Sequence, residues 1–169
     1  DWCIAMYQKA VDLGAEVLVL GDDAGHSQGP MLSPAMWREF IFPYHQRIVD
    51  ALSPPMIWHS VGNVASLLPM AIEAGFVGFH GVDPMAGLDL ATVKRAFGRE
   101  LVIIGNVDVR LLFGEDLAAV RQEVDRCIEQ GAPGGRYMVA SCNSISDGMN
   151  PAAVMEMFRY QGEVGVYQD

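Results

Sequence analysis

The fold is decided by the stretch Met56-Ile57-Trp58-His59-Ser60-Val61-Gly62-Asn63. A short apolar run ends in polar residues and glycine, and an apolar pattern with helical spacing follows at 65–74. A buried parallel strand has this pattern where its carboxyl end reaches the surface. The stretch therefore predicts a strand that carries His59 and Asn63 to the carboxyl edge of a sheet.

The same layout recurs four more times along the chain. Each further apolar run leads into polar residues or glycine, and these runs lie at 17–20, 76–79, 101–104 and 137–140. Helical patterns alternate with the strands, at 2–13, 36–52, 65–74, 90–97, 116–130 and 151–160, and Pro43 should divide the second of them. This alternation predicts a parallel α/β sheet with right-handed crossovers.

Two architectures fit that pattern, an open doubly wound sheet and part of an eight-stranded (β/α)8 barrel. No Gly-x-Gly-x-x-Gly motif stands at a strand-to-helix turn, and every strand, not one switch point, ends in polar residues. We therefore predict a (β/α)8 TIM barrel of which residues 1–169 supply about the last five βα units, as a single N-terminally incomplete domain. Because the chain opens at Asp1 without Met, we expect a processed, truncated or partially sequenced product.

Composition excludes several classes of function. The 169 residues carry a formal net charge of −10 and no cluster of Lys and Arg, which argues against nucleic-acid binding. No apolar run approaches the ~20 residues that a membrane span requires. Three cysteines without regular spacing predict no disulfide framework, so we expect a cytoplasmic location.

Several residues at the strand ends are candidate catalytic residues. Asp22 and Asp23 are adjacent and should point to opposite faces, so one can enter the barrel as ligand or base while the other caps a loop or helix. His59 has the strongest functional case, as a catalytic residue or a metal ligand. Asn106 and Asp108 lie two residues apart, and they either hydrogen-bond a pyrrole or a metal ligand or, for Asp108, cap a helix.

Further strand-end residues are candidates for cofactor or metal binding. Cys142 is either a metal-binding thiolate or an inert buried thiol. His80 is either a second imidazole of the site or a histidine that bonds neighbouring strand ends. We assign Asn63, His80 and Asn143 to cofactor binding, and His59 with Cys142 to a metal.

The chain resembles the uroporphyrinogen decarboxylase superfamily, which also contains zinc-dependent methyltransferases that act on corrinoid proteins and thiols. The resemblance covers essentially the whole chain. It is carried, in order, by Asp22-Asp23-Ala24-Gly25, Gly29-Pro30, Phe42-Pro43-Tyr44, His59-Ser60-Val61-Gly62-Asn63, Gly105-Asn106-Val107-Asp108 and the Cys142 loop that leads to Asn150-Pro151. It implies a (β/α) barrel with its site at the carboxyl ends of the strands.

The resemblance implies two activities, and this chain departs from the pattern of each. The decarboxylases carry Ser at the position of Asp22 and His at that of Asn143. The methyltransferases carry a His-x-Cys motif and a later Cys, whereas Val61 stands here at the position of the first Cys. We favour a zinc-assisted methyltransferase, with His59 and Cys142 as ligands, an Asp near the first strand end in place of the lost Cys, and a corrinoid as methyl donor or acceptor. The alternatives are a cofactor-free decarboxylase of a tetrapyrrole and a non-catalytic barrel that binds a corrinoid or tetrapyrrole.

The expected partners follow from this reading. The substrate is a small molecule or a corrinoid protein, and the missing N-terminal part of the same barrel should complete the domain. A half barrel would expose two open sheet edges, so we expect the isolated chain to aggregate or to need a partner, with a homodimer as one such assembly.

Overall fold

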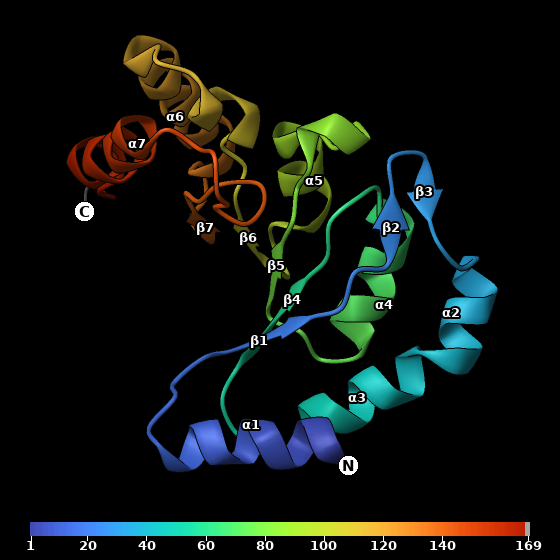
Figure 1. The fold of residues 1–169 in the computed structure, drawn as a ribbon. Coiled ribbons are helices and arrows are strands. Elements are labelled where there is room, and N and C mark those ends of the chain that lie inside the picture. Colours follow the sequence, from blue (N-terminus) through green and yellow to red (C-terminus); the bar gives the residue numbers. More distant parts are fainter. Residues whose placement is uncertain (168–169) are drawn as a thin grey trace.

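A computed structural model describes residues 1–167 (Figure 1). Five parallel strands form one sheet, and their order in space equals their order in the chain. They are β1 (Leu18–Gly21), β4 (Met56–His59), β5 (Gly78–His80), β6 (Val102–Ile104) and β7 (Tyr137–Met138). All five predicted strands are confirmed, although the last three are shorter than the apolar runs that predicted them.

The strand order distinguishes the two predicted architectures. Right-handed crossovers between successive neighbours place every helix on the same face, whereas a doubly wound sheet reverses its order at a switch point. The burial of strand residues agrees with helices on one face only, because Leu18 and Leu20 of β1 are buried whereas Val19 between them is 50% exposed. The sheet is therefore an arc of a (β/α) barrel with one covered and one open face, and the doubly wound alternative is wrong.

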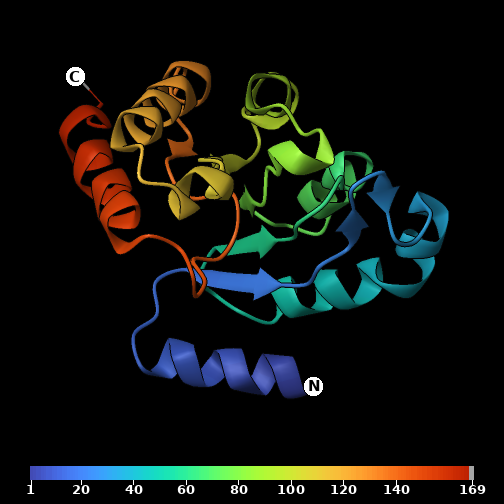
Figure 2. The same ribbon diagram turned by 45° about the horizontal axis from the view of Figure 1, so that its top comes forward.

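The helices line the covered face in sequence. They are α1 (Trp2–Asp12), α2 (Pro34–Phe40), α3 (Phe42–Asp50), α4 (Leu68–Glu73), α5 (Leu90–Phe97), α6 (Leu117–Gly131) and α7 (Pro151–Val164). Helices α2, α3 and α4 contact one another in turn, as do α5, α6 and α7. Figures 1 and 2 show this arc around the strands, with α1 apart from α5, α6 and α7.

Local sequence explains where the helices begin. The Ser33 side chain accepts a hydrogen bond from the Met36 amide at the start of α2, and Asn150 caps α7 through the Ala152 amide. Pro43 lies in the first turn of α3, where a proline is tolerated, and the chain breaks between α2 and α3 at Ile41. The predicted division of this helical pattern at Pro43 is confirmed.

Four short elements were not predicted. Strands β2 (Gly25–His26) and β3 (Gly29–Pro30) pair as an antiparallel hairpin within the expected loop. The 3₁₀ helices η2 (Pro84–Ala86) and η3 (Val109–Phe113) follow the ends of β5 and β6. A further 3₁₀ helix, η1 (Ala65–Leu67), forms the first turn of the helix predicted at 65–74 and continues as α4. These elements line the carboxyl edge of the sheet.

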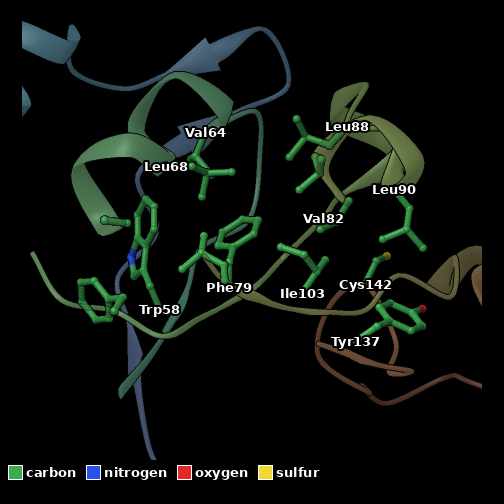
Figure 3. Packing of buried hydrophobic residues seen from close by; sticks show 14 of the residues in the cluster. Trp58, Val64, Leu68, Phe79, Val82, Leu88, Leu90, Ile103, Tyr137 and Cys142 are labelled. Atoms are coloured by element: carbon green, nitrogen blue, oxygen red, sulfur yellow. The ribbon is translucent and has the colours of Figure 1, made fainter. Parts of the chain in front are cut away.

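The core lies between the sheet and its helices. The outward row of strand residues consists of Leu20, Trp58, Phe79, Ile103 and Tyr137, all in register. Figure 3 shows four of these packed near Leu68 and Leu90 of the covering helices. Among the described residues, no helix is both long and apolar enough to span a membrane.

Candidate functional site

Two imidazoles meet at the carboxyl edge of the sheet. His59 ends β4 and His80 ends β5, and the two residues are directly paired in the register of these parallel strands. Their side chains lie on the face opposite the core row, because Trp58 and Phe79 immediately before them point to the helices. The two Nδ1 atoms are 2.8 Å apart and the ring centroids 4.7 Å, so the imidazoles share a hydrogen bond.

The pair continues to a third strand end. The Nε2 atom of His80 lies 3.0 Å from the carbonyl oxygen of Ser141, which follows β7. Ser141 is buried and pairs in an isolated parallel bridge with Val107, three residues beyond the end of β6. The alternative in which His80 bonds neighbouring strand ends is therefore observed, and its role as a second imidazole of a functional site stays a prediction.

The electrostatic environment of His59 favours its neutral form. Partial burial lowers the pKa of His59 below its usual value, and the neighbouring His80 lowers it further, while the charge of Asp23 acts in the opposite direction. A neutral imidazole has one ring nitrogen with a free lone pair. His59 is therefore placed to accept a proton or to bind a metal.

Asp22 and Asp23 point to different sides, as their adjacency predicts. The Asp22 carboxylate lies 2.8 Å from Nε2 of His45, which is buried on α3 among Trp37 and other aromatic residues. Asp23 accepts a hydrogen bond from the Val61 amide at 3.1 Å, and it is near enough to influence His59. Asp23 thus lies on the side of His59, and the catalytic role assigned to each carboxylate stays a prediction.

The turn after His59 packs directly on the loop after β1. The Asn63 amide donates to the His26 carbonyl at 2.9 Å, and the Ala24 amide donates to the Ser60 hydroxyl at 2.9 Å. Gly62 has a φ of +81°, and a Cβ there would lie 2.4 Å from the carbonyl carbon of Gly25. These contacts hold the predicted residue Asn63 at the rim, and Ser60 is a buried anchor that the sequence did not single out.

Asn106 and Asp108 are held by the chain's own arginines. The Asn106 side-chain oxygen accepts from Arg126 of α6 at 3.0 Å. Asp108 caps η3 through the Arg110 amide at 2.9 Å and pairs with the Arg110 guanidinium, which lowers the pKa of the Asp108 carboxyl. The predicted cap role of Asp108 is confirmed. Both residues line one groove of about 370 Å³ together with Glu123.

Cys142 and Asn143 lie in the loop after β7. The Cys142 side chain is fully buried in the hydrophobic core, and Figure 3 shows it beside Tyr137 and near Leu90. Burial raises the pKa of the Cys142 thiol, which keeps it protonated at neutral pH. The Asn143 side chain accepts from the Ser144 amide within the same loop. The inert-thiol alternative for Cys142 is the one that this environment favours.

The positions of these side chains test whether they form the set of zinc ligands that the resemblance implies. A catalytic zinc takes three protein ligands, usually with thiolate, imidazole or carboxylate donors. Within residues 1–167, no group of three or more His, Cys, Asp or Glu side chains is arranged to hold a metal ion. Val61, which stands in place of a family Cys, offers no side-chain donor. The residues that the structure describes therefore do not fit zinc with three protein ligands.

Sequence reasoning missed the partners that hold the predicted residues. His45 binds Asp22, and Arg126 binds both Asn106 and Glu123. Only the Glu123–Arg126 pair has a sequence signal, because residues three apart on a helix are neighbours.

Comparison with known proteins finds relatives of this chain. Residues 1–163 match the family described as Uroporphyrinogen decarboxylase (URO-D). A methylated-thiol–coenzyme M methyltransferase of Methanosarcina mazei is 28% identical over 135 residues, which are 78% of this chain and 34% of that protein. A uroporphyrinogen decarboxylase of Xanthomonas axonopodis is 30% identical over 159 residues, which are 89% of this chain and 42% of that protein. The chain thus spans less than half the length of these curated relatives.

Solved structures show the same fold. A methyltransferase from Methanosarcina mazei superposes with a TM-score of 0.79 at 22% sequence identity, covering 97% of this chain and 47% of that one. A dihydropteroate synthase of Xanthomonas albilineans reaches a TM-score of 0.66 at 14% identity, covering 96% of this chain and 61% of that one. In both cases the match is to part of a (β/α) barrel, in agreement with the sequential arc of strands.

Proposed function

The chain belongs to the uroporphyrinogen decarboxylase family, and from this premise we propose that the protein transfers a methyl group to a thiol or a similar acceptor. His59 takes the proton of the acceptor in this proposal, and a methylated corrinoid is the donor. The similarity to a methylated-thiol methyltransferase supports the choice of reaction class.

One observation supports the proposed role of His59 as a general base. Its Nδ1 atom is hydrogen-bonded to His80, whereas Nε2 has no hydrogen-bond partner among the described residues. A general base needs such a nitrogen within reach of the proton that it takes. The thiolate is the nucleophilic form of a thiol, so removing the proton activates the acceptor.

The proposed step balances without a metal ion. The S–H bond of the acceptor breaks and its proton goes to Nε2 of His59. The freed electron pair on sulfur forms the new S–C bond, and the electron pair of the broken donor–carbon bond stays with the donor. Because the zinc set is incomplete in the described residues, no step is assigned to a metal.

The test measures methyl transfer from methylcobalamin to 2-mercaptoethanol by the full-length protein. We expect His59→Gln to lower kcat/KM by about 10²–10⁴-fold, the usual contribution of a general base. His26→Gln is the matched control, because His26 lies exposed in the β2–β3 hairpin. Elemental analysis should find less than stoichiometric zinc. One zinc per chain, lost in His59→Gln, would contradict the metal-free step.

A second candidate is decarboxylation of a tetrapyrrole acetate. It is favoured by the decarboxylase relatives, one of which is 30% identical across 89% of this chain. Against it, Asn106 and Asp108 already accept hydrogen bonds from Arg126 and Arg110, which leaves them less free to bind pyrrole N–H groups. Release of CO₂ from uroporphyrinogen would support the decarboxylase, and cobalamin binding without turnover would support a non-catalytic barrel.

A further inference from the structure

We infer that His80 is a positioning residue that fixes the proton of neutral His59 on Nδ1 and so leaves Nε2 proton-free. The inference rests on the proposed function for its catalytic meaning, but the hydrogen bonds that support it exist without any substrate. It follows from counting donors and acceptors along three strand ends.

The Ser141 carbonyl determines which ring nitrogen of His80 carries a proton. A carbonyl oxygen only accepts hydrogen bonds, so Nε2 of His80, 3.0 Å away, must carry the proton of that bond. Ser141 is buried and its segment is held by the bridge to Val107, which fixes the position of this acceptor. In a neutral imidazole only one nitrogen is protonated. With both imidazoles neutral, Nδ1 of His80 is then an acceptor.

The hydrogen bond between the two imidazoles then determines the tautomer of His59. The two Nδ1 atoms are 2.8 Å apart, which requires one donor and one acceptor between them. Since Nδ1 of His80 accepts, Nδ1 of His59 donates and carries the proton of that ring. The free lone pair of His59 is therefore on Nε2, the nitrogen that the proposed reaction uses.

The backbone holds both rings in place for this purpose. Direct pairing of His59 with His80 sets the separation of the two side chains, and the Ser60 amide donates to the His80 carbonyl at 3.1 Å. A Cβ on the following residue, Gly81, would lie 2.0 Å from the Ser60 carbonyl oxygen, so the two turns are in close contact. The identity of the nitrogen that carries the proton is set by the partner of the other nitrogen.

Nitrogen-15 NMR of the full chain with labelled histidine tests the inference directly. Ring nitrogens with and without a proton have well-separated chemical shifts, and single variants assign the four histidines. Above the titration range of His59, we expect one tautomer with Nδ1 protonated. His80→Phe removes the acceptor and should release the proton to both nitrogens. His80→Asn keeps an acceptor oxygen near the Nδ1 position and should restore the single tautomer.

The activity of the two variants should follow the tautomer. We expect His80→Phe to lower kcat/KM for methyl transfer by about 10–100-fold, as loss of a residue that orients a catalytic group does, and His80→Asn to recover most of it. A merely structural role predicts equal losses in both variants. His59 with Nε2 protonated in the unchanged protein, or an unaltered tautomer in a folded His80→Phe variant, would overturn the inference. The expected tautomer without methyl transfer would instead refute the proposed function alone.

Discussion

The turn after His59 depends on the absence of a side chain at Gly62. Its φ of +81° is strained for other residues, and a Cβ would also lie 2.7 Å from the Gly25 carbonyl oxygen. We expect Gly62→Ala to lower the free energy of unfolding by about 2–4 kcal/mol, because two backbone segments must separate. Urea unfolding measures this.

Gly134 provides the matched control for that substitution. It has a similar φ of +79° but no atom within 4 Å of the added Cβ. Gly134→Ala should therefore cost only the backbone strain, about 1–2 kcal/mol. Equal losses in the two variants would show that the contact between the two loops contributes nothing.

For individual residues, the sequence predicts which side chains reach the strand ends but not what they contact there. The periodicity of a strand places His59 and His80 on one face, and the adjacency of Asp22 and Asp23 separates them. Their partners come from distant segments, such as His45 on α3 for Asp22. Beyond a strand end no period governs the direction of a side chain, so the sequence left open whether Cys142 is a metal-binding thiolate or a buried thiol.

Among the elements, α6 and α7 are joined by an acidic residue between two arginines. Glu156 of α7 accepts from Arg121 of α6 and from Arg159 of its own helix, and its side chain is only 9% exposed. The hydrogen bond from Arg159, and next the one from Arg121, lower the pKa of Glu156 to about 2. The ionised carboxylate is thus stabilised in the folded state.

This ion-pair group predicts a specific acid sensitivity. A carboxyl group with a depressed folded pKa stabilises the fold above its unfolded pKa and loses that contribution as the pH falls to the folded value. The contribution of Glu156 should therefore disappear between about pH 4.5 and 2. We expect the Tm of Glu156→Gln to be lower at pH 7 and to depend less on pH in that window.

Glu163→Gln is the control, since Glu163 also pairs with Arg159 but its side chain is 54% exposed. Its Tm should follow that of the unchanged protein at every pH. A parallel pH dependence in Glu156→Gln and in the unchanged protein would contradict the prediction.

Helices and strands whose apolar residues recur with a clear period were predictable from the sequence. Elements without such a period were not. The alternation of apolar strands and amphipathic helices predicted five strands and the division at Pro43. The β2–β3 hairpin lies in a stretch rich in Gly, Ser and Pro without alternating hydrophobicity, and its two-residue strands are too short for any period to appear. Helix α1 was predicted correctly, yet none of its residues is buried.

On the scale of the whole molecule, the 169-residue chain has one apolar face without a cover in the described residues. Val19 of β1 is 50% exposed and Met138 of β7 is 56% exposed, both on the face opposite the core. Trp2 and Leu13 of the helical segment before β1 are more exposed still. Burial of such surface contributes about 25 cal/mol per Å², which favours association with any complementary apolar surface.

The sheet also ends in two edge strands. Within residues 1–167, β1 pairs only with β4 and β7 only with β6. The Tyr7 hydroxyl donates to the Val19 carbonyl at 2.8 Å, so α1 satisfies part of the β1 edge. Unpaired edges pair readily with other chains. Together with the apolar face, they lead us to expect that the 169-residue chain, produced by itself, self-associates into dimers or larger species.

Size-exclusion chromatography with light scattering over a range of concentrations measures this association. A Val19→Lys/Met138→Lys double variant places charges on the open face, where no core contact is lost, and should raise the monomer fraction while the far-ultraviolet circular dichroism stays unchanged. Met155→Lys is the control, because Met155 is 65% exposed on α7 at the outside of the arc. If the unchanged chain runs as a monodisperse monomer with a cooperative melt, the open face is stable in water and the expectation is wrong. If Met155→Lys dissolves the assemblies as well as the double variant does, association depends on net charge and not on the open face of the sheet.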